Sequence, residues 1–296
     1  MRRSEAGSPE IVATGSRRLW LCRSSRAGVT GHSVGDASIR GDRVALLDVQ
    51  EVTVRFGGIV ALQDLTFAIE RGQICGLIGP NGAGKTTMFN VVSRIYQPQS
   101  GKVLFDGQDL LKVPANGIAR RGIARTFQNL ALWPSMTVLQ NVMVGAHSSS
   151  KQNFITAPLR IGTRREERRL ASRAYEILDD LSLADVAFRP AAGLPFGTLK
   201  RIELARALAS NPKLLMLDEP ASGLTHSEVD ELGEVVRHLR DHYSLTVLLV
   251  EHHMAMVMGI SDNVVVMDFG RKIAEGTPAE VSRNPRVIEA YLGGAA

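Results

Sequence analysis

The sequence predicts an α/β fold around a parallel or mixed β-sheet, and three observations lead to that prediction. Apolar runs at Ile74–Ile78, Leu214–Leu217 and Leu245–Val250 have the length and composition of buried parallel strands. The first run leads into a glycine-rich loop, and a helical pattern follows the loop. Segments with helical spacing also separate the later runs, and strand–helix–strand alternation is typical of a sheet covered by helices.

Two further strands are expected ahead of the first apolar run. They are indicated by an alternating series, a glycine turn and a second apolar series: Val52, Val54, Phe56, Gly57–Gly58, Leu62, Leu65 and Phe67. Val264–Met267 is expected to form another strand. Beyond the glycine-rich loop, helical spacing predicts a helix that includes Met88, Val91, Val92 and Ile95.

Capping signals and periodicity predict the remaining helices. Thr225 and Glu228 form a T-x-x-E capping box, which opens a helix that buries Val229, Leu232, Val236 and Leu239. Thr277 and Glu280 repeat the box, and Asn284–Pro285 opens a last short helix that ends at Gly293. From about 129 to 196 the pattern is mostly helical, with a core face of Ala174, Ile177, Leu178 and Leu181 and a solvated charged run at Arg164–Arg169.

Composition and charge exclude several classes of protein. The chain has 296 residues, 44% hydrophobic and 22% charged, which is incompatible with a fibrous or wholly disordered protein. Its two cysteines exclude a disulfide scaffold. No apolar run reaches the roughly 18–20 residues that span a bilayer. The sequence therefore predicts a globular protein that does not cross a membrane by itself.

Most of the net charge of +5 lies in the first 43 residues, which hold eight arginines and four acidic residues. These residues are rich in arginine, serine and glycine without a sustained period, so we expect a disordered extension at 1–43. An upstream start codon is the preferred explanation for it, and Glu5 and Glu10 argue against a transit peptide. Because the folded part is nearly neutral, no specific nucleic-acid partner is expected.

The glycine-rich loop carries the first chemical signal. It fits the pattern G-x-x-x-x-G-K-[ST] between a strand and a helix, which predicts the P-loop NTPase core and a site for a nucleoside triphosphate. Glycines allow backbone N–H groups to converge on phosphate oxygens, and the lysine reaches the β- and γ-phosphates. The predicted nucleotide-binding residues are Gly79, Pro80, Asn81, Gly82, Ala83, Gly84, Lys85, Thr86 and Thr87.

Two adjacent carboxylates end a second buried strand. Asp218 directly follows Leu214–Leu217, and Glu219 comes next. We expect Asp218 and the Thr86 hydroxyl to hold Mg²⁺, with Asp218 acting through water. Glu219 is then placed to polarise the attacking water, and the metal charge makes neighbouring carboxylates tolerable.

From these motifs onward the chain resembles the ATP-binding-cassette ATPases over about residues 46 to 292. Further landmarks occur in the family's order: Phe56, Thr126–Gln128, Leu194–Thr198 and Glu251–His252. The resemblance implies an ATPase domain at 44–296, with a helical subdomain at about 129–196 inserted between the Q-loop and the signature. It also implies that Gln128 contacts Mg²⁺ and the attacking water and that His252 contacts the γ-phosphate.

Three roles remain open or altered at this point. Phe56 either stacks on adenine, as the resemblance implies, or fills the core. Leu132 and Trp133 either form a docking groove for a partner helix or pack in the core. In the signature, Pro195, Phe196 and Thr198 replace the usual serine, glycine and glutamine, and Ser222–Thr225 departs from the usual Ser-Ala-Leu-Asp D-loop.

We expect Gly197 and the helix after it to bind the nucleotide of a second subunit in trans. The lost serine hydroxyl weakens that contact by roughly 0.5–3 kcal/mol.

Within the family the chain resembles the larger ATP-binding subunit of branched-chain amino acid importers. The likeness lies in Ala124–Gln128, Met136–Val142 and Asn284–Gly293. It implies transmembrane permease subunits, a second ATPase in a homo- or heterodimer, and indirectly a substrate-binding protein, with the chain peripheral on the cytoplasmic face of the cell membrane. Alternatives are the ATPase of a lipid or lipopolysaccharide exporter, a urea or amide importer, a non-transport cassette, or a binding-only regulatory subunit.

Overall fold

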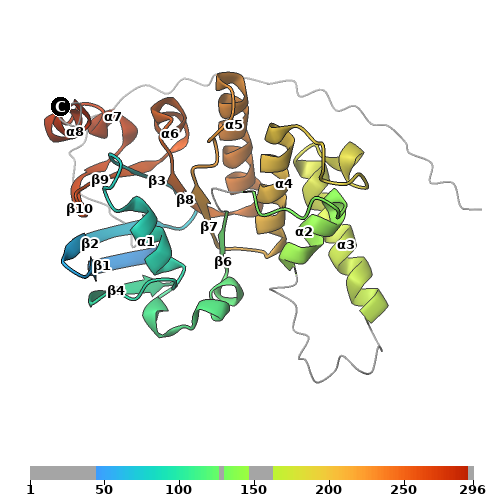
Figure 1. The fold of residues 1–296 in the computed structure, drawn as a ribbon, viewed down its shortest axis with the longest axis horizontal. Helices are drawn as coiled ribbons and strands as arrows, with labels where there is room; N and C mark the ends of the chain where they lie inside the picture. The colour runs from blue at the N-terminus through green and yellow to red at the C-terminus, as the bar shows by residue number, and fades with distance from the viewer. Residues whose placement is uncertain (1–44, 127–129, 147–162, 293–296) are drawn as a thin grey trace, which may run out of the picture. The chain divides into compact units, whose positions relative to one another are not determined.

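A computed structural model describes residues 45–126, 130–146 and 163–292 of the chain (Figure 1). These residues belong to one compact unit, Asp42–Ala296. The predicted extension at 1–43, the predicted Q-loop residue Gln128 and the predicted helix end at Gly293 lie outside the described residues. The predictions for these segments therefore stay predictions.

A six-stranded mixed sheet forms the centre of the unit. Five of its strands run parallel, and only the edge strand β10 pairs antiparallel with its neighbour. The order is β10 (Arg271–Gly276), β9 (Asn263–Asp268), β3 (Ile74–Ile78), β8 (Thr246–Val250), β7 (Leu214–Asp218) and β6 (Ile123–Arg125). The four apolar runs singled out in the sequence are β3, β7, β8 and β9, so the predicted α/β fold is confirmed.

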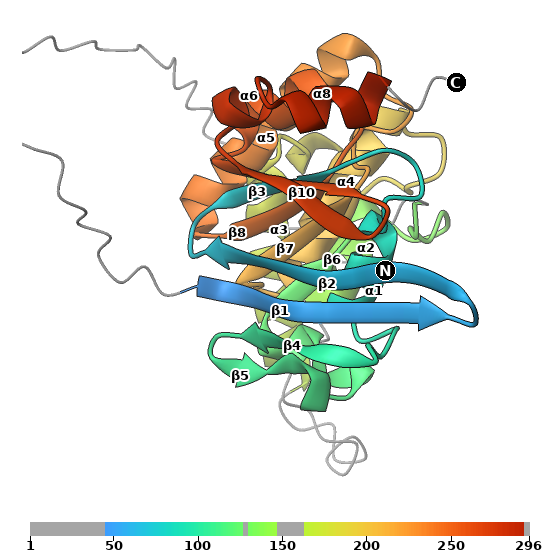
Figure 2. The ribbon, with the colours of Figure 1, turned by 90° about the vertical axis from the view of Figure 1, so that its left-hand side faces the viewer.

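A second, antiparallel sheet packs near the first helix (Figure 2). Its order is β2 (Ile59–Glu70), β1 (Ala45–Phe56), β4 (Ser100–Phe105) and β5 (Gln108–Asp109). Helix α1 (Lys85–Val92) shares one hydrophobic core with this sheet and with one face of the central sheet. Short 3₁₀ helices follow at η1 (Leu110–Lys112), η2 (Ala115–Gly117) and η3 (Ala119–Arg121).

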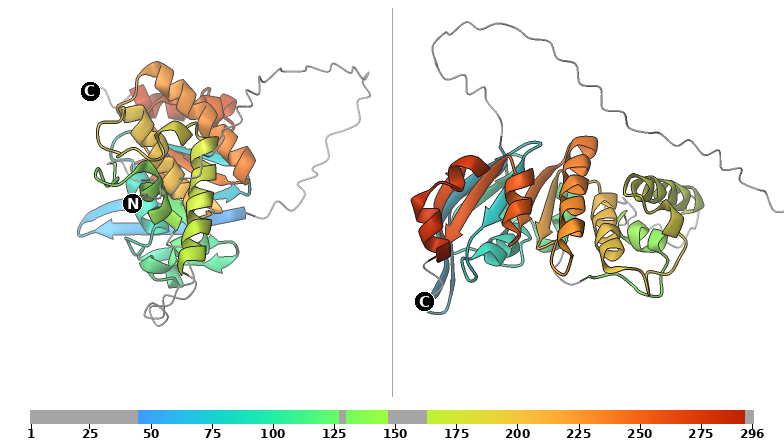
Figure 3. Two further views of the ribbon diagram at one scale, coloured as in Figure 1. Left: turned by 90° about the vertical axis from the view of Figure 1, so that its right-hand side faces the viewer. Right: turned by 90° about the horizontal axis from the view of Figure 1, so that it is seen from above.

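The remaining helices share a second hydrophobic core with the opposite face of the central sheet, and some of them lie beyond one edge of that sheet (Figure 3). They are α2 (Val138–Ala146), α3 (Thr163–Asp180), α4 (Phe196–Ala209), α5 (His226–Tyr243), α6 (Met254–Ile260), α7 (Pro278–Val281) and α8 (Pro285–Leu292), with the 3₁₀ helix η6 (Ala184–Val186). Strand β3 illustrates the layering, because Ile74 and Ile78 face these helices while Cys75 and Leu77 face the core around α1.

The helices α2, α3 and α4 pack against one another. The predicted core face of α3 is buried, with Ile177 and Leu178 fully enclosed, and Glu167–Arg169 of the charged run are exposed. Both predicted capping boxes are present, at Thr225 of α5 and Thr277 of α7.

One detail of the helical predictions is wrong. Helix α1 ends at Val92, and Ile95 lies in the following turn with 56% of its surface exposed. The helix stops there because Arg94 takes a left-handed backbone conformation with φ of 59°. The predicted last short helix is present as α8, where Val287 is buried and Ile288 and Tyr291 are more than one third exposed.

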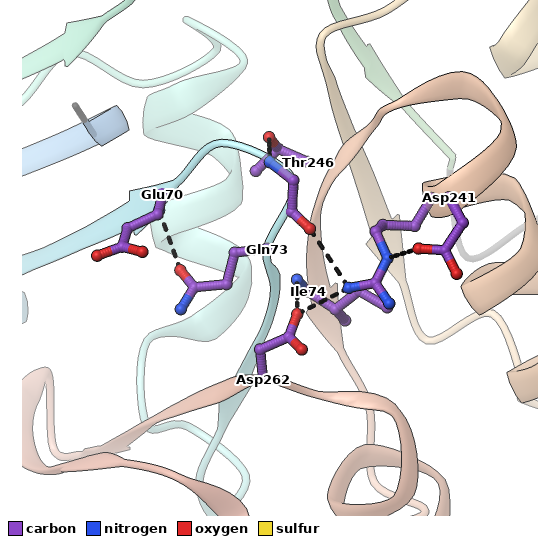
Figure 4. Close-up of polar contacts among 8 residues, drawn as sticks. Glu70, Gln73, Ile74, Asp241, Thr246 and Asp262 are labelled. Carbon is purple, nitrogen blue, oxygen red and sulfur yellow. Dashed lines mark hydrogen bonds and ion pairs between the residues drawn. The ribbon is translucent and has the colours of Figure 1, made fainter. Parts of the chain in front are cut away.

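The start of β3 is held by a polar network (Figure 4). The Ile74 N–H donates to Asp262 Oδ2 over 2.7 Å, and the Gly72 N–H donates to Thr246 Oγ1 over 3.0 Å. Arg240 donates to the same Asp262 oxygen over 3.0 Å and pairs with Asp241. Because β3 runs directly into the glycine-rich loop, these contacts fix the register of the strand that presents that loop.

Candidate functional site

The phosphate loop, residues 79–86, joins β3 to α1 and is held by close backbone contacts. A Cβ at Gly79 would lie 2.1 Å from the Met267 carbonyl oxygen, and one at Gly84 would lie 2.7 Å from the Ala61 carbonyl oxygen. The Gly270 N–H also donates to the Ala83 carbonyl over 3.0 Å. Only glycine fits these approaches, so the spacing of the motif has a steric cause in this fold.

Lys85 is almost fully buried beneath the loop. Its Nζ donates to the carbonyls of Gly79 over 2.7 Å and of Pro80 over 2.9 Å. Burial lowers the pKa of Lys85, while the negative charges of Glu219 and Asp218 act in the opposite direction. The Lys85 ammonium is therefore hydrogen-bonded to the loop and lies in the field of the two carboxylates.

One cavity of about 360 Å³ brings Glu219 and His252 together with most of the predicted phosphate-binding residues. It is lined by residues 81–87 of the loop and helix, by Glu219 and His252, and by Ile59, Val60, Ala61 and Phe269. Strands β7 and β8 deliver Glu219 and His252 from their carboxyl ends, where α/β sheets commonly bind ligands. Of the predicted residues outside this lining, Gly79 and Pro80 border the other side of the loop.

Glu219 and His252 form a pair across the cavity. His252 Nε2 lies 2.8 Å from Glu219 Oε1. Glu219 has a left-handed backbone with φ of 48°, and its N–H donates to the Val250 carbonyl over 2.8 Å. Left-handed backbone conformations of non-glycine residues are strained and are common at functional sites. At Glu219 this conformation directs the carboxylate away from the strand and toward His252.

Asp218 has the surroundings expected of a metal ligand. The residue is 2% exposed, and its Oδ2 accepts from Arg125 over 2.7 Å. Its Oδ1 is buried and has no hydrogen-bond partner among residues 45–126, 130–146 and 163–292. A buried carboxylate oxygen without a hydrogen-bond partner, one residue before the cavity-lining Glu219, fits the oxygen-donor preference of Mg²⁺. Thr86 lines the cavity, whereas Asp218 does not.

Arg125 is a site residue to which the sequence reading assigned no role. Its guanidinium also donates to Asn90 Oδ1 over 2.8 Å and to Ser93 Oγ over 3.1 Å, and its centre lies 5.4 Å from the Phe89 ring centroid. It therefore ties α1 to the end of β7. A lone arginine in front of the predicted Q-loop carries no sequence signal for this pairing, because the partner carboxylate is 93 residues away.

Glu251 is a second residue of this kind. The side chain is 2% exposed and accepts three backbone N–H groups, from Ala221 over 2.6 Å, His252 over 2.8 Å and His253 over 3.2 Å. It thereby joins the segment after Glu219 to the segment that carries His252. An acid directly after a buried strand was the only signal in the sequence.

Phe56 is not a core residue, which removes one of the two readings of its role. It is 45% exposed at the end of β1, and its ring packs edge-on against Tyr96 with centroids 4.9 Å apart. Trp133 is likewise 45% exposed rather than buried, and Leu132 is partly buried against the core. Stacking on adenine and docking of a partner remain predictions for these side chains.

Gly197 lies in the first turn of α4 and lines a different, smaller cavity of about 150 Å³ together with Glu228. The structure therefore does not bring it to the cavity of the phosphate loop in the same chain. The C-terminal helix α8, in contrast, borders that loop through Tyr291. Burial raises the pKa of Tyr291 to about 12, and a hydrogen bond from the Gly79 backbone acts the other way.

Comparisons with known proteins agree with this geometry. A family model described as ABC transporter matches residues 62–222, and one described as Branched-chain amino acid ATP-binding cassette transporter matches residues 271–296. The chain is 42% identical over 249 residues to the high-affinity branched-chain amino acid transport ATP-binding protein BraF of Pseudomonas aeruginosa, covering 84% of this chain and 98% of BraF. The same figures hold for LivG of Escherichia coli K12.

A solved structure gives the same assignment. The ADP conformation of MJ1267, an ATP-binding cassette of an ABC transporter, matches with a TM-score of 0.74 and 30% identity over 84% of this chain and 99% of that chain. Together with the Glu219–His252 pair and the phosphate loop around one cavity, these matches show that the chain belongs to the ATP-binding-cassette ATPases of ABC transporters.

Proposed function

We propose that this chain is the ATP-hydrolysing subunit of an importer that takes up branched-chain amino acids through separate membrane permeases. The observation that carries the proposal is the meeting of Glu219, His252 and the phosphate loop around one cavity. The cargo rests on likeness: BraF and LivG are named as branched-chain amino acid transport proteins, and the C-terminal match has the same cargo in its description.

Each side chain of the cavity has a distinct task in hydrolysis. Glu219 takes the proton of the attacking water, and His252 keeps the carboxylate aimed through their 2.8 Å contact. Lys85 exchanges its two loop carbonyls for phosphate oxygens, and Phe56 offers its exposed ring to the adenine. Phosphoryl transfer depends mainly on such positioning and charge stabilisation.

Thr86 and Asp218 are the residues that would hold Mg²⁺, with Gln128 added by family resemblance. The metal supplies positive charge that offsets the charge on the phosphate oxygens. Arg125 leaves Oδ1 of Asp218 as the oxygen available for this purpose, because it occupies Oδ2.

A second cassette completes the site in this proposal. The N-terminal end of α4, with Gly197, contributes backbone N–H groups and the helix dipole to the nucleotide held by the partner. The N-cap residue Pro195 makes no side-chain hydrogen bond to the backbone N–H groups at this end of the helix. Its side chain therefore leaves these groups available to a phosphate. The partner cassette is either a second copy or a sister subunit.

The permease contact is proposed for the segment around Trp133. This ring is half-exposed, and the buried Asn141 fixes the segment, accepting from the Trp133 N–H over 2.8 Å and donating to the Trp133 and Thr137 carbonyls over 3.1 Å each. Tyr175 and Phe188 add a second exposed aromatic pair with centroids 6.1 Å apart. Rigidly held exposed aromatics suit a docking surface for a permease helix.

Within the described part of the chain, no helix is long and apolar enough to cross a bilayer. We propose that the chain is held at the cytoplasmic face of the cell membrane by the permease, and that a substrate-binding protein takes part indirectly. These partners follow from the transport role named for the relatives.

The test is the Glu219→Gln variant in the complex purified with its permease. Turnover is expected to fall by about 10²–10⁴, the range for loss of a general base, while ATP binding stays near the wild-type level. Glu234→Gln on the exposed side of α5 serves as the control. Near-normal hydrolysis in Glu219→Gln would contradict the proposed role of Glu219 as the general base.

The cargo is tested separately in vesicles that contain the wild-type complex. ATP-dependent uptake of leucine, isoleucine and valine is expected, and urea is the matched negative substrate. Uptake of urea without the three amino acids would contradict the proposed cargo and support an amide importer.

A further inference from the structure

The two segments that depart from the family pattern touch each other. Phe196 is the first residue of α4, and Gly223 lies in the loop that precedes α5. A Cβ at Gly223 would lie 3.0 Å from Cε1 and 3.4 Å from Cζ of Phe196, closer than side chains normally pack. The Phe196 ring therefore rests on the bare backbone of Gly223, and an alanine there would displace the ring.

Further side-chain contacts join the same two segments. A Cβ at Gly197 would lie 2.9 Å from Oε1 of Glu228, whose other oxygen is engaged in the α5 capping box with Thr225. Arg201, one turn along α4, pairs with Glu231 over 2.6 Å. The start of α4 is thus seated on the start of α5 and on the loop before it.

Phe196 itself is held from its own helix. The Nζ atom of Lys200 lies 5.5 Å from the ring centroid, within cation–π range, and Lys200 is only 3% exposed. The ring is 44% exposed, so it stands at the surface with one edge on Gly223. An exposed aromatic that is fixed by a buried cation and a glycine has a defined position although little protein covers it.

We infer that Phe196 and Gly223 form one interlocking pair that holds the signature segment at a fixed spacing from the loop 222–225. Phe196 is a positioning residue in this view, because it sets where the N-terminal end of α4 points rather than touching the nucleotide. The inference rests on the proposed function, since the segment so positioned faces the nucleotide of a partner cassette.

A double-mutant cycle tests the pair in the transporter complex. The variants are Phe196→Ala, Gly223→Ala and the double variant, and the readout is retention of a non-hydrolysable ATP analogue after gel filtration. Gly223→Ala alone is expected to weaken retention by about tenfold, whereas in the Phe196→Ala background it adds less than about twofold, because contacting residues are not additive.

A matched control separates the contact from backbone strain. Gly107 has a left-handed φ of 73° and nothing within 4 Å of its would-be Cβ, whereas Gly223 has a φ of 82° and the Phe196 ring. Gly107→Ala therefore carries the same conformational penalty without the contact, and it is expected to leave retention unchanged.

Two further outcomes are distinguishable. If the effects of the two substitutions add, the pair is overturned while the two-cassette site stands. If the wild-type complex retains no analogue, the two-cassette site itself fails and the positioning role fails with it. Thermal unfolding of each purified variant, expected to differ little between Phe196→Ala and the double variant, shows that all four chains are folded.

Discussion

The two halves of the nucleotide site are built in different ways. The phosphate loop is buried and fitted against main chain, as the approaches of Gly79 to the Met267 carbonyl and of Gly84 to the Ala61 carbonyl show. The signature segment lies at the surface, where the side chain of Phe196 rests on the backbone of Gly223. The close contacts of the loop are made to main-chain oxygens, which every residue carries, whereas the contact at Gly223 depends on the particular side chain of Phe196.

The network around Asp218 extends the first of these halves. Arg125 connects the carboxylate to Asn90 of α1 and to Ser93 directly after it, and Glu251 connects the segments that follow β7 and β8. These buried charges have hydrogen-bond partners on several elements, so hydrogen bonds connect the elements that surround the phosphate loop. At the exposed Phe196–Gly223 contact the neighbouring buried charge is Lys200, which meets the face of the Phe196 ring.

The largest effect is expected from Gly79→Ala. The added methyl would sit 2.1 Å from a main-chain oxygen, which cannot move without shifting β9. We expect ATP affinity to fall by about 100-fold or more, equal to about 2.7 kcal/mol, or the chain to lose its fold. Equilibrium nucleotide binding and thermal unfolding measure the two.

Gly58→Ala is the control for this substitution, because nothing lies within 4 Å of its would-be Cβ. Binding within about twofold of the wild type is expected there. The same result for Gly79→Ala would show that the phosphate loop is not fixed by main-chain contact, and the contrast between the two halves would disappear.

A smaller effect is expected from Arg125→Met. The Arg125 and Asp218 side chains are 9% and 3% exposed, and removal of one partner leaves a buried charge uncompensated. Such a loss lowers the free energy of unfolding by about 3–5 kcal/mol, measured by denaturant titration. Arg237→Met, which breaks a half-exposed pair with Glu234, is expected to stay within about 1 kcal/mol. Equal losses in both variants would contradict the role assigned to Arg125.

The smallest effect is expected from Thr225→Ala, which removes the cap beneath the signature half. Loss of an N-cap side chain lowers the free energy of unfolding by about 1 kcal/mol. Thr277→Ala removes the matching cap of α7 and is expected to have a similar effect on stability. Only Thr225→Ala is expected to reduce ATP hydrolysis by the complex as well. Equal hydrolysis rates in the two variants would show that the Thr225 cap does not influence the nucleotide site.

The capping effect also has a predictable pH dependence. The backbone N–H of Thr225 donates to the Glu228 carboxylate, the Thr225 hydroxyl adds to it, and together they hold the pKa of Glu228 below its usual range. A lowered folded-state pKa gives stability that is complete above the ordinary carboxyl pKa and is lost as the pH falls through the folded value. The difference in the free energy of unfolding between the wild type and Thr225→Ala should therefore become smaller at acidic pH.

Local patterns predicted most of the elements correctly, and the failures have identifiable causes. The strands β3, β7 and β8 were predictable because strands buried on both faces must be apolar throughout, and the caps of α5 and α7 because their partners stand three residues apart. Ile95 was misplaced because helical spacing continues past Val92 while the backbone at Arg94 does not. The sequence could not decide whether Phe56 and Trp133 are buried or exposed, because aromatic residues occur in both environments and no local pattern distinguished them.

The sequence by itself determined the α/β fold, the phosphate loop and the carboxylates of the site, because each is encoded within a few neighbouring residues. Only the tertiary structure decided that Arg125 holds Asp218, that Glu251 joins the segments after β7 and β8, and that Phe196 rests on Gly223. These partners stand 93, 30 and 27 residues apart in the chain. Their pairing depends on where the parallel strands and their helices come together in space, and no local pattern records that distance.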